Sequence, residues 1–426
     1  MIEAKEYREK ANKKDREDIL KEFRDYFKTP ERVIYFDGNS LGMMPYKSER
    51  VAHDLVSKEW GERLIRGWNE NWWEMPIRVS GQIARLTGCD SDEIMVCDST
   101  SVNLYKLIRA GLNLQKGRKK IISDDLNFPS DLYVIQGIIK SLDDGHRLEL
   151  VHTEDGVRVE HDELFNKIDE DTALVVLSYV SFRSAFIYDM QRITEFAHMK
   201  GALVIWDLSH ATGAVKIDLH SADADMAVGC TYKYLNGGPG SPAFLYVKRE
   251  LQDSVVSPVW GWLGEKSPFE FSLDYRPSEG ARKYMTGSPN ILSLCTLEPS
   301  LGIILDAGMD NIRNKSLSLT AFMLELYQAF LEPLGFGLGS PEKDEERGSH
   351  ISIKHPEGYR ICRALIDSSR GNYVIIPDFR PPDNIRMGLS PLYNKFEEVF
   401  EVILEIRDIV INRIYELYDS KTESVT

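Results

Sequence analysis

The sequence has few cysteines, and their arrangement marks neither a disulfide scaffold nor a metal site. The chain of 426 residues holds five of them without a Cys-x-x-C pair: Cys89, Cys97, Cys230, Cys295 and Cys362. An odd number of scattered cysteines favours a reducing compartment and buried thiols over disulfide bonds or zinc binding. We therefore expect no bound metal.

Long apolar runs and basic stretches are also missing. No run approaches the ~18 uninterrupted apolar residues of a membrane span, and the charged N-terminal segment lacks the apolar centre of a signal peptide. The formal net charge is −15, which argues against nucleic acid as a partner and is most simply explained by solubility. Apolar residues at 42% and charged residues at 28% are ordinary for a globular protein. We expect a cytoplasmic protein.

The middle of the chain alternates short apolar runs with segments of helical length. Each run is rich in β-branched residues and apolar on both faces, as in a buried parallel strand. The runs cover residues 94–97, 120–123, 148–151, 174–177, 203–206 and 244–247. A helix is expected over residues 102–112, where apolar residues recur at helical spacing. This alternation predicts an α/β fold with a mainly parallel sheet.

After about residue 300 the pattern changes. Long helical patterns at 317–330 and 395–418 flank short strands at 350–354 and 373–376, and residues 337–349 form a polar loop in this interpretation. A single core rarely grows beyond about 250–300 residues, so a second domain is expected. We predict an N-terminal segment at 1–55 that packs with the small domain, a large α/β domain at 56–299, and a small C-terminal α+β domain at 300–426.

Asp207 and Lys233 carry the most informative chemistry. Asp207 ends an apolar run, and open α/β sheets bind ligands at strand ends. A carboxylate there can pair with the protonated nitrogen of a pyridoxal ring. A nearby lysine, in Thr-Tyr-Lys233-Tyr, can hold the same cofactor covalently and then move protons. A surface lysine and a helix-capping aspartate are the alternative.

Three weaker signals lie near these residues. The hydroxyls of Asp98-Ser-Thr-Ser101 come directly before the expected helix, where free backbone N–H groups bind anions such as a phosphate. A plain helix N-cap without a ligand is the alternative interpretation of the same residues. Phe128 could stack on the cofactor ring or belong to the core. His210 could contact the cofactor or be structural.

Taken together, these segments resemble the bacterial form of the kynureninase family, from about residue 30 to 415. The resemblance rests on motifs that occur in the same order and spacing: Asp37-Gly-Asn-Ser-Leu-Gly42, Asp98-Ser-Thr-Ser-Val-Asn-Leu104, Asn127-Phe-Pro-Ser-Asp131, Trp206-Asp-Leu-Ser-His210, Gly229-Cys-Thr-Tyr-Lys-Tyr-Leu-Asn-Gly-Gly238, Gly261-Trp-Leu-Gly264 and Arg386-Met-Gly-Leu-Ser-Pro-Leu-Tyr393.

The resemblance implies a type I pyridoxal-phosphate fold and a homodimer with active sites at the interface. The implied reaction is hydrolysis of L-kynurenine, or its 3-hydroxy form, to anthranilate or 3-hydroxyanthranilate and L-alanine, in tryptophan catabolism and NAD biosynthesis. Lys233, Tyr232 and Asp207 are the implied catalytic residues. Cofactor contacts are implied for Thr100, Ser101, Phe128, Pro129, Ser130, Asp131, Ser178, Asp207, His210, Tyr232 and Lys233, with Trp262 and Ser288 supplied by the second subunit.

Substrate contacts are implied for Arg386, Trp68 and Ser40. Arg386 would grip the substrate carboxylate, a task that suits its bidentate fork. Trp68 would lie beside the aromatic ring of the substrate, with a core tryptophan as the alternative.

The chain departs from the family pattern at Glu265, where a histidine is usual, and at Phe182-Arg-Ser-Ala185. These changes leave open a second type I activity on a cysteine-like substrate or a modified kynurenine. A non-catalytic, cofactor-binding protein is a third alternative, which the pairing of Lys233 with Asp207 disfavours.

Overall fold

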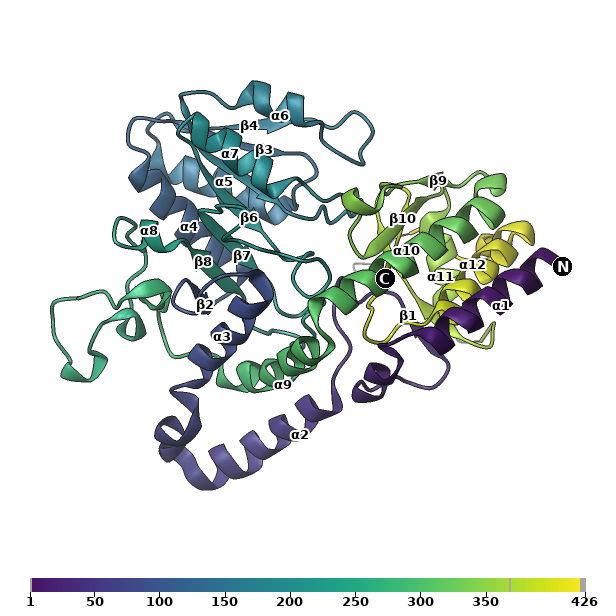
Figure 1. Cartoon of the computed structure of the whole chain (residues 1–426), viewed down its shortest axis with the longest axis horizontal. Helices are drawn as coiled ribbons and strands as arrows, with labels where there is room; N and C mark the ends of the chain where they lie inside the picture. Colours follow the sequence, from purple (N-terminus) through teal and green to yellow (C-terminus); the bar gives the residue numbers. More distant parts are fainter. Residues whose placement is uncertain (1, 368, 422–426) are drawn as a thin grey trace.

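The computed structural model describes residues 2–367 and 369–421, which form two lobes, each with its own sheet (Figure 1). The larger lobe holds a seven-stranded sheet in the order β2-β8-β7-β6-β5-β3-β4. Its strands are β2 (Ile94–Val96), β3 (Lys120–Asp124), β4 (Arg147–Val151), β5 (Thr172–Ser178), β6 (Leu203–Asp207), β7 (Met226–Gly229) and β8 (Phe244–Val247). Neighbouring strands from β4 to β7 are parallel, and β8 runs antiparallel to both β7 and β2. The prediction of a mainly parallel sheet is confirmed.

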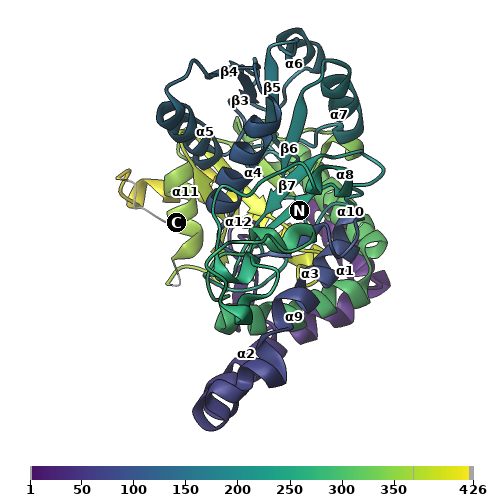
Figure 2. The same cartoon turned by 90° about the vertical axis from the view of Figure 1, so that its left-hand side faces the viewer.

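Helices cover both faces of this sheet, so its central strands are apolar throughout. Figure 2 shows α4 (Thr100–Leu114) and α5 (Pro129–Leu142) on one side, with α6 (His161–Lys167) and α7 (Met190–Met199) on the other. Leu174 and Val176 of β5 pack in the core on the α4 side, while Val175 and Leu177 pack with the α7 side. Because successive strand residues point to opposite faces, a strand buried on both sides needs apolar residues at every position.

The lobe is completed by α3 and by short helices after β8. These are α3 (Met75–Thr87), α8 (Arg249–Gln252), η5 (Trp262–Gly264), η6 (Pro268–Glu270) and η7 (Gly280–Tyr284). The long helix α9 (Ile291–Ala307) packs against α3 and α2 (Tyr46–Asp54). Between α2 and α3 the chain forms three short, irregular helices, η2 (Leu55–Arg63), η3 (Leu64–Arg66) and η4 (Trp68–Trp72).

The smaller lobe is built on an antiparallel sheet in the order β12-β13-β10-β9. Its strands are β9 (Gly337–Leu338), β10 (His350–Lys354), β12 (Asp378–Arg380) and β13 (Asn384–Gly388). Helices α10 (Met309–Phe330), α11 (Gly358–Ile366) and α12 (Phe396–Ile411) surround it, with the short helices η8 (Glu332–Leu334), η9 (Asp344–Glu346) and η10 (Ile414–Leu417). The region 337–349 is not the uniform polar loop that we expected, because it contains β9 and η9 and because Arg347 is fully buried.

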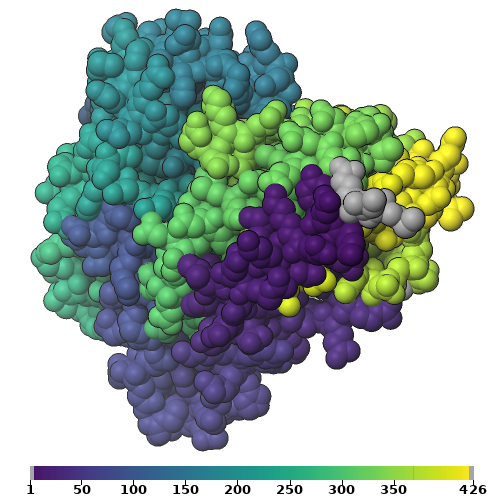
Figure 3. Space-filling model, turned by 45° about the vertical axis from the view of Figure 1, so that its right-hand side comes forward, coloured from purple at the N-terminus to yellow at the C-terminus, as the bar shows by residue number. Residues whose placement is uncertain are grey.

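The N-terminal segment lies across the smaller lobe (Figure 3). Helix α1 (Ile2–Glu17) packs on α12, and β1 (Val33–Tyr35) pairs in parallel with β11 (Val374–Ile376); the short η1 (Lys21–Tyr26) lies between α1 and β1. Ile34 and Phe36 join the core of the smaller lobe, whereas Met43 and Leu55 join that of the larger one. We propose the division at 1–55, 56–299 and 300–426, in which the first segment packs with the smaller lobe through α1 and β1 and contacts the larger lobe through Met43 and Leu55.

Within residues 2–367 and 369–421, each helix taken singly is too short or too polar to cross a bilayer. Only α9 and α10 taken together meet the length and composition of a span, and they meet at a bend of 80°.

Asp124, at the end of β3, supplies a pH test of the fold. Burial raises the pKa of this fully enclosed carboxyl to about 6, with the Tyr188 hydroxyl donating to it at 2.8 Å. A raised folded-state pKa means that the contribution to stability is present below about pH 4 and is lost as the pH rises through about 6. We expect Asp124→Asn to gain stability over the parent protein between pH 4 and 8, by up to roughly 3 kcal/mol. Urea unfolding at several pH values measures this difference; a constant difference contradicts the prediction.

Candidate functional site

The candidate site lies where three parallel strands of the large sheet end. Ser178 ends β5 and pairs in register with Asp207, which ends β6. The chain that leaves β7 reaches Lys233 within a few residues, and its turn is held by a bond from the Gly237 amide to the Thr231 carbonyl (2.9 Å). Ligands bind at this edge of open α/β sheets because the strand ends and the helix N-termini meet there.

Lys233 is half-buried and its amine faces three aromatic side chains. Its Nζ lies 2.8 Å from Nε2 of His210 and 5.9 Å from the ring centroids of both Phe128 and Tyr232. Phe128 remains 39% exposed, so the amine lies in a place that a small molecule can reach. The structure therefore brings together four residues that the sequence assigned to the cofactor.

The backbone of Lys233 is held by the N-terminal segment. The Gly42 amide donates to the Tyr232 carbonyl at 2.8 Å. A Cβ atom on Gly42 would lie 2.3 Å from the Lys233 carbonyl oxygen, so this close approach requires glycine.

Asp207 and Asp131 form a buried pair of carboxyl groups beneath the amine. Oδ1 of Asp207 accepts from the backbone N–H and the hydroxyl of Ser209, at 2.8 and 2.6 Å. Burial and then the adjacent Asp207 raise the pKa of Asp131 well above its ordinary value, while Lys233 acts in the opposite direction. Burial also raises the pKa of Asp207. Two enclosed carboxyl groups favour one shared proton or a bound cation.

The N-termini of α4 and α5 form an anion-binding corner. Ser99 caps α4 and the hydroxyls of Ser101 and Ser130 lie 2.9 Å apart, which joins the first turns of the two helices. The turn before α4 is anchored by an ion pair between the fully buried Lys106 and Asp98. Thr100 and Pro129 begin the two helices, so their positions are set by the same turns. Free N–H groups and positive dipole ends favour a phosphate there.

These residues fit pyridoxal phosphate. The buried carboxyl pair favours a cationic ring nitrogen, and Oδ2 of Asp131 has no hydrogen-bond partner among the described residues. The paired helix N-termini suit the phosphate, and the Lys233 amine is available for a covalent bond to an aldehyde. The site thus offers a matching group for the ring nitrogen, for the phosphate and for the aldehyde of the cofactor.

Arg386 lies on β13 and is 1% exposed. Its guanidinium donates to the Phe182 carbonyl at 2.5 Å and to the Ser40 hydroxyl at 3.0 Å, and it forms an ion pair with Asp378. Nε makes no hydrogen bond. The structure therefore brings Ser40 to the arginine, as expected for two residues of one binding site.

Trp68, Trp262 and Ser288 are not brought to Lys233 within one chain: among the described residues, no hydrogen bond, ion pair or ring contact joins them to it. Trp68 and Trp262 instead flank Trp73, at centroid distances of 6.5 and 6.3 Å. Trp262 is 41% exposed, and Ser288 is also exposed.

Three polar residues of the site had no role in the sequence-based prediction. Asn127 donates to Ser123 and accepts from Ser178 (2.7 Å), which fixes the loop before Phe128. Asp378 pairs with Arg386 from the neighbouring strand. His350 is buried next to His210. Asn127 lies inside a recognised motif and could have been found there; the other two are reached only through strand pairing.

The two departures from the family pattern occupy different places. Glu265 is largely buried and pairs with Arg276 at 2.9 Å, so its charge is balanced within its own loop. Phe182 lies at the site, because its carbonyl accepts from Arg386 and its ring meets Phe128 edge-on at 5.2 Å.

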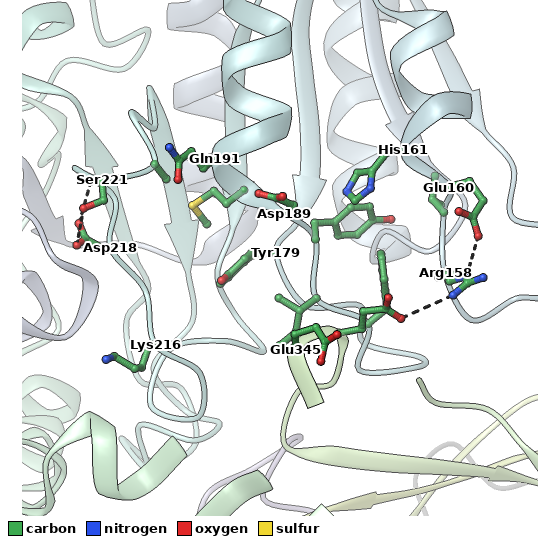
Figure 4. A pocket seen from close by; sticks show the side chains of 17 residues that line it. Arg158, Glu160, His161, Tyr179, Asp189, Gln191, Lys216, Asp218, Ser221 and Glu345 are labelled. Atoms are coloured by element: carbon green, nitrogen blue, oxygen red, sulfur yellow. Dashed lines mark hydrogen bonds and ion pairs between the residues drawn. The ribbon is translucent and has the colours of Figure 1, made fainter. Parts of the chain in front are cut away.

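A separate cavity of about 560 Å³ lies where the larger lobe meets η9, and none of the predicted site residues lines it (Figure 4). Three of its acidic groups have structural roles: Asp189 caps α7, Glu160 pairs with Arg158, and Asp218 accepts from Ser221.

Comparison with known proteins decides the family. A kynureninase from Pseudomonas fluorescens is 41% identical over 401 residues, which cover 93% of this chain and 94% of that protein. The chain belongs to the kynureninase family. A kynureninase from Burkholderia mallei (strain SAVP1) is 39% identical over 95% of both chains, and the family described as the kynureninase C-terminal domain matches residues 312–406.

Solved structures agree with the type I fold of this family. A cysteine desulfurase from Escherichia coli superposes with a TM-score of 0.77 at 17% identity, covering 94% of this chain and 99% of that one. A variant of a cystine C–S lyase, with glycine covalently linked to its PLP cofactor, gives a TM-score of 0.76 at 15% identity, covering 89% and 100%. At this identity the likeness establishes the fold alone.

Proposed function

We propose that the protein hydrolyses L-kynurenine to anthranilate and L-alanine, with pyridoxal phosphate bound at Lys233. The observation that carries this proposal is the meeting of Lys233 with the buried Asp207–Asp131 pair at one strand edge, in a member of the kynureninase family. Arg386 reaches the same site from β13 through the Phe182 carbonyl. The same family supports a place in tryptophan catabolism. We further propose a cytoplasmic location and a link to NAD biosynthesis; the scarce, scattered cysteines support the location.

The residues grouped around Lys233 would each contact a different part of the cofactor. Asp207 would face the ring nitrogen, Phe128 and His210 would bound the ring, and Ser101 and Ser130 would hold the phosphate with Thr100 and the Pro129 turn. Pyridoxal phosphate, when bound, withdraws electrons from the substrate skeleton and so weakens the bond between Cβ and the γ-carbonyl carbon.

Lys233 and Tyr232 would move protons. The Lys233 amine would take the Cα proton of the substrate. The neighbouring Cys230 and burial raise the pKa of Tyr232 above its ordinary value, so its hydroxyl stays protonated and can donate during bond cleavage. Water then supplies the oxygen that appears in the carboxylate of anthranilate.

Arg386 and Ser40 would hold the α-carboxylate, and this arrangement differs from a surface arginine. Burial lowers the pKa of Arg386, with Asp378 opposing the shift. Its charge is balanced by Asp378, while Nε makes no hydrogen bond among the described residues. A substrate carboxylate that reached Nε would supply this missing partner.

We also propose a homodimer whose partner subunit covers each site. The first turns of α4 are open, with Val102 43% and Tyr105 38% exposed, and Phe128 is 39% exposed. Trp262 and Ser288 are also exposed, and Ser288 lines a small cavity with Asp98. A symmetric pair in which one chain presents these two residues to the open edge of the other accounts for both observations.

The first test is the reaction itself. Purified protein should convert L-kynurenine to anthranilate, followed by ultraviolet absorbance, and 3-hydroxy-L-kynurenine as the second substrate gives the preference between the two. Borohydride treatment followed by peptide mapping should label Lys233. Turnover of cysteine without turnover of either kynurenine, or labelling of another lysine, contradicts the proposal.

The second test concerns the arginine. Loss of a buried partner of a charged group costs about 2–5 kcal/mol, so Arg386→Ala should lower kcat/KM roughly 30-fold or more. Arg386→Lys should recover only part, since a point charge lacks the fork. Arg380→Ala is the matched control, because Arg380 shares Asp378 at 3.0 Å but is half-exposed. Equal losses in Arg380→Ala and Arg386→Ala would assign the effect to Asp378 instead of to the substrate.

The third test concerns the interface. Arg386→Ala and Trp262→Ala proteins, each weakly active alone, should gain activity when mixed under conditions of subunit exchange. A hybrid dimer would hold one site with both changes and one with neither. Flat activity after demonstrated exchange means that each site is built from a single chain.

A further inference from the structure

Three buried ring nitrogens between Lys233 and Arg386 have no hydrogen-bond partner among the residues that the structure describes. They are Nδ1 of His210 and both ring nitrogens of His350. His210 is 6% exposed and His350 is fully buried. A buried polar atom left unpaired costs about 1–3 kcal/mol, and here three of them lie on two neighbouring rings. Their gathering at one place therefore points to a function that the packing alone does not explain.

The contact with Lys233 determines where the proton of His210 lies. A lysine ammonium group has donors only, so Nε2 of His210, 2.8 Å away, is the acceptor of that contact. A neutral imidazole that accepts at Nε2 carries its proton on Nδ1. The Nδ1–H group then needs an acceptor inside the protein.

His350 is placed to be that acceptor. Its ring centroid lies 5.8 Å from that of His210, with the rings inclined at 60°. At this separation two ring nitrogens can share a hydrogen bond after a small rotation, or through one water molecule. The Arg183 backbone raises the pKa of His350 slightly against the other influences, although neither ring nitrogen has a hydrogen-bond partner at the usual distance among the described residues.

The strand pair that carries Arg386 also holds His350. On β10, His350 pairs in register with Gly388 of β13, and Ser352 pairs with Arg386. Burial, Arg386 and Lys233 lower the pKa of His350, and burial, Lys233, Arg386 and His350 lower that of His210. Both rings therefore stay neutral, which a donor–acceptor pair of imidazoles requires.

We propose that His350 is a positioning residue for the reaction: it accepts a hydrogen bond from Nδ1–H of His210 and so keeps the Nε2 lone pair of His210 directed at the Lys233 amine. The inference rests on the proposed attachment of the cofactor to Lys233. It assigns His350 no contact with substrate. Without His350, His210 can rotate or carry its proton on Nε2, and the lysine loses its only described hydrogen-bond acceptor.

The test compares His350→Leu and His350→Gln with the parent protein. Leucine fills the space without an acceptor, whereas the glutamine amide oxygen can accept from His210. In His350→Leu we expect kcat to fall roughly 10-fold or more, a part of the 10²–10⁴-fold range of acid–base catalysis, with KM changed less than threefold because Arg386 is intact. The visible absorbance of the bound cofactor and the borohydride-trapped fraction at Lys233 should fall too. His350→Gln should restore most of each signal.

The control is His355→Gln, which changes a half-buried histidine just beyond β10 that packs on Phe336 and accepts from the Glu357 amide. It should match the parent protein. Thermal unfolding of the cofactor-free proteins completes the set: His350→Leu should be as stable as the parent or more so, because an unpaired buried polar group has been removed.

Two outcomes overturn the inference alone: parent-like kcat and absorbance in His350→Leu, or equal losses in His350→Leu and His350→Gln, which assign His350 to packing. If the parent protein itself shows no trapping at Lys233, the proposed function fails and the inference fails with it. The parent measurement thus separates the two failures.

Discussion

The burial of two carboxyl groups opposite one amine is the constraint on which the site depends. Asp207 and Asp131 cannot both remain charged next to each other in an enclosed place without a cation. The Lys233 amine supplies part of that charge in the protein alone. Every neighbouring feature keeps this arrangement in place: Ser209 holds Asp207, the Gly42 segment holds the Lys233 backbone, and His210 receives the amine. In the proposed function, a cationic cofactor ring would complete the charge balance that these groups leave open.

The burial of the site also explains why the large sheet could be predicted well. Helices cover both faces of the sheet and enclose the strand ends, so the strands must be apolar along their length. For five of the six expected runs, both ends lie within one residue of the ends of an observed strand. The sixth run, 174–177, lies inside the longer β5. Strand β7 was missed because Met226-Ala-Val-Gly229 is short and holds two small residues, which no periodicity sets apart from a loop.

The smaller lobe was harder to predict, since its contacts join distant segments. The helix expected at 317–330 begins earlier, at Met309, and that at 395–418 breaks after Ile411. Asp378 and His350 gain their places only through the pairing of β12 and β10 with β13. A sequence pattern records which face of a strand is apolar, but not which strand lies beside it. The motif residues were found because the resemblance to a known family assigns each of them a place in the site.

Several of the buried polar atoms without a hydrogen-bond partner among the described residues lie at the junction of the two lobes. Nδ1 of His210 comes from the larger lobe, while Nε of Arg386 and both nitrogens of His350 come from the smaller one. If packing were their only purpose, apolar side chains of similar size would be more stable there. The protein instead keeps unpaired polar atoms between Lys233 on one lobe and Arg386 on the other. In the proposed function, the substrate amine would bond to the cofactor beside Lys233, and the substrate carboxylate would pair with Arg386. Binding to groups from both lobes would then stabilise the folded protein.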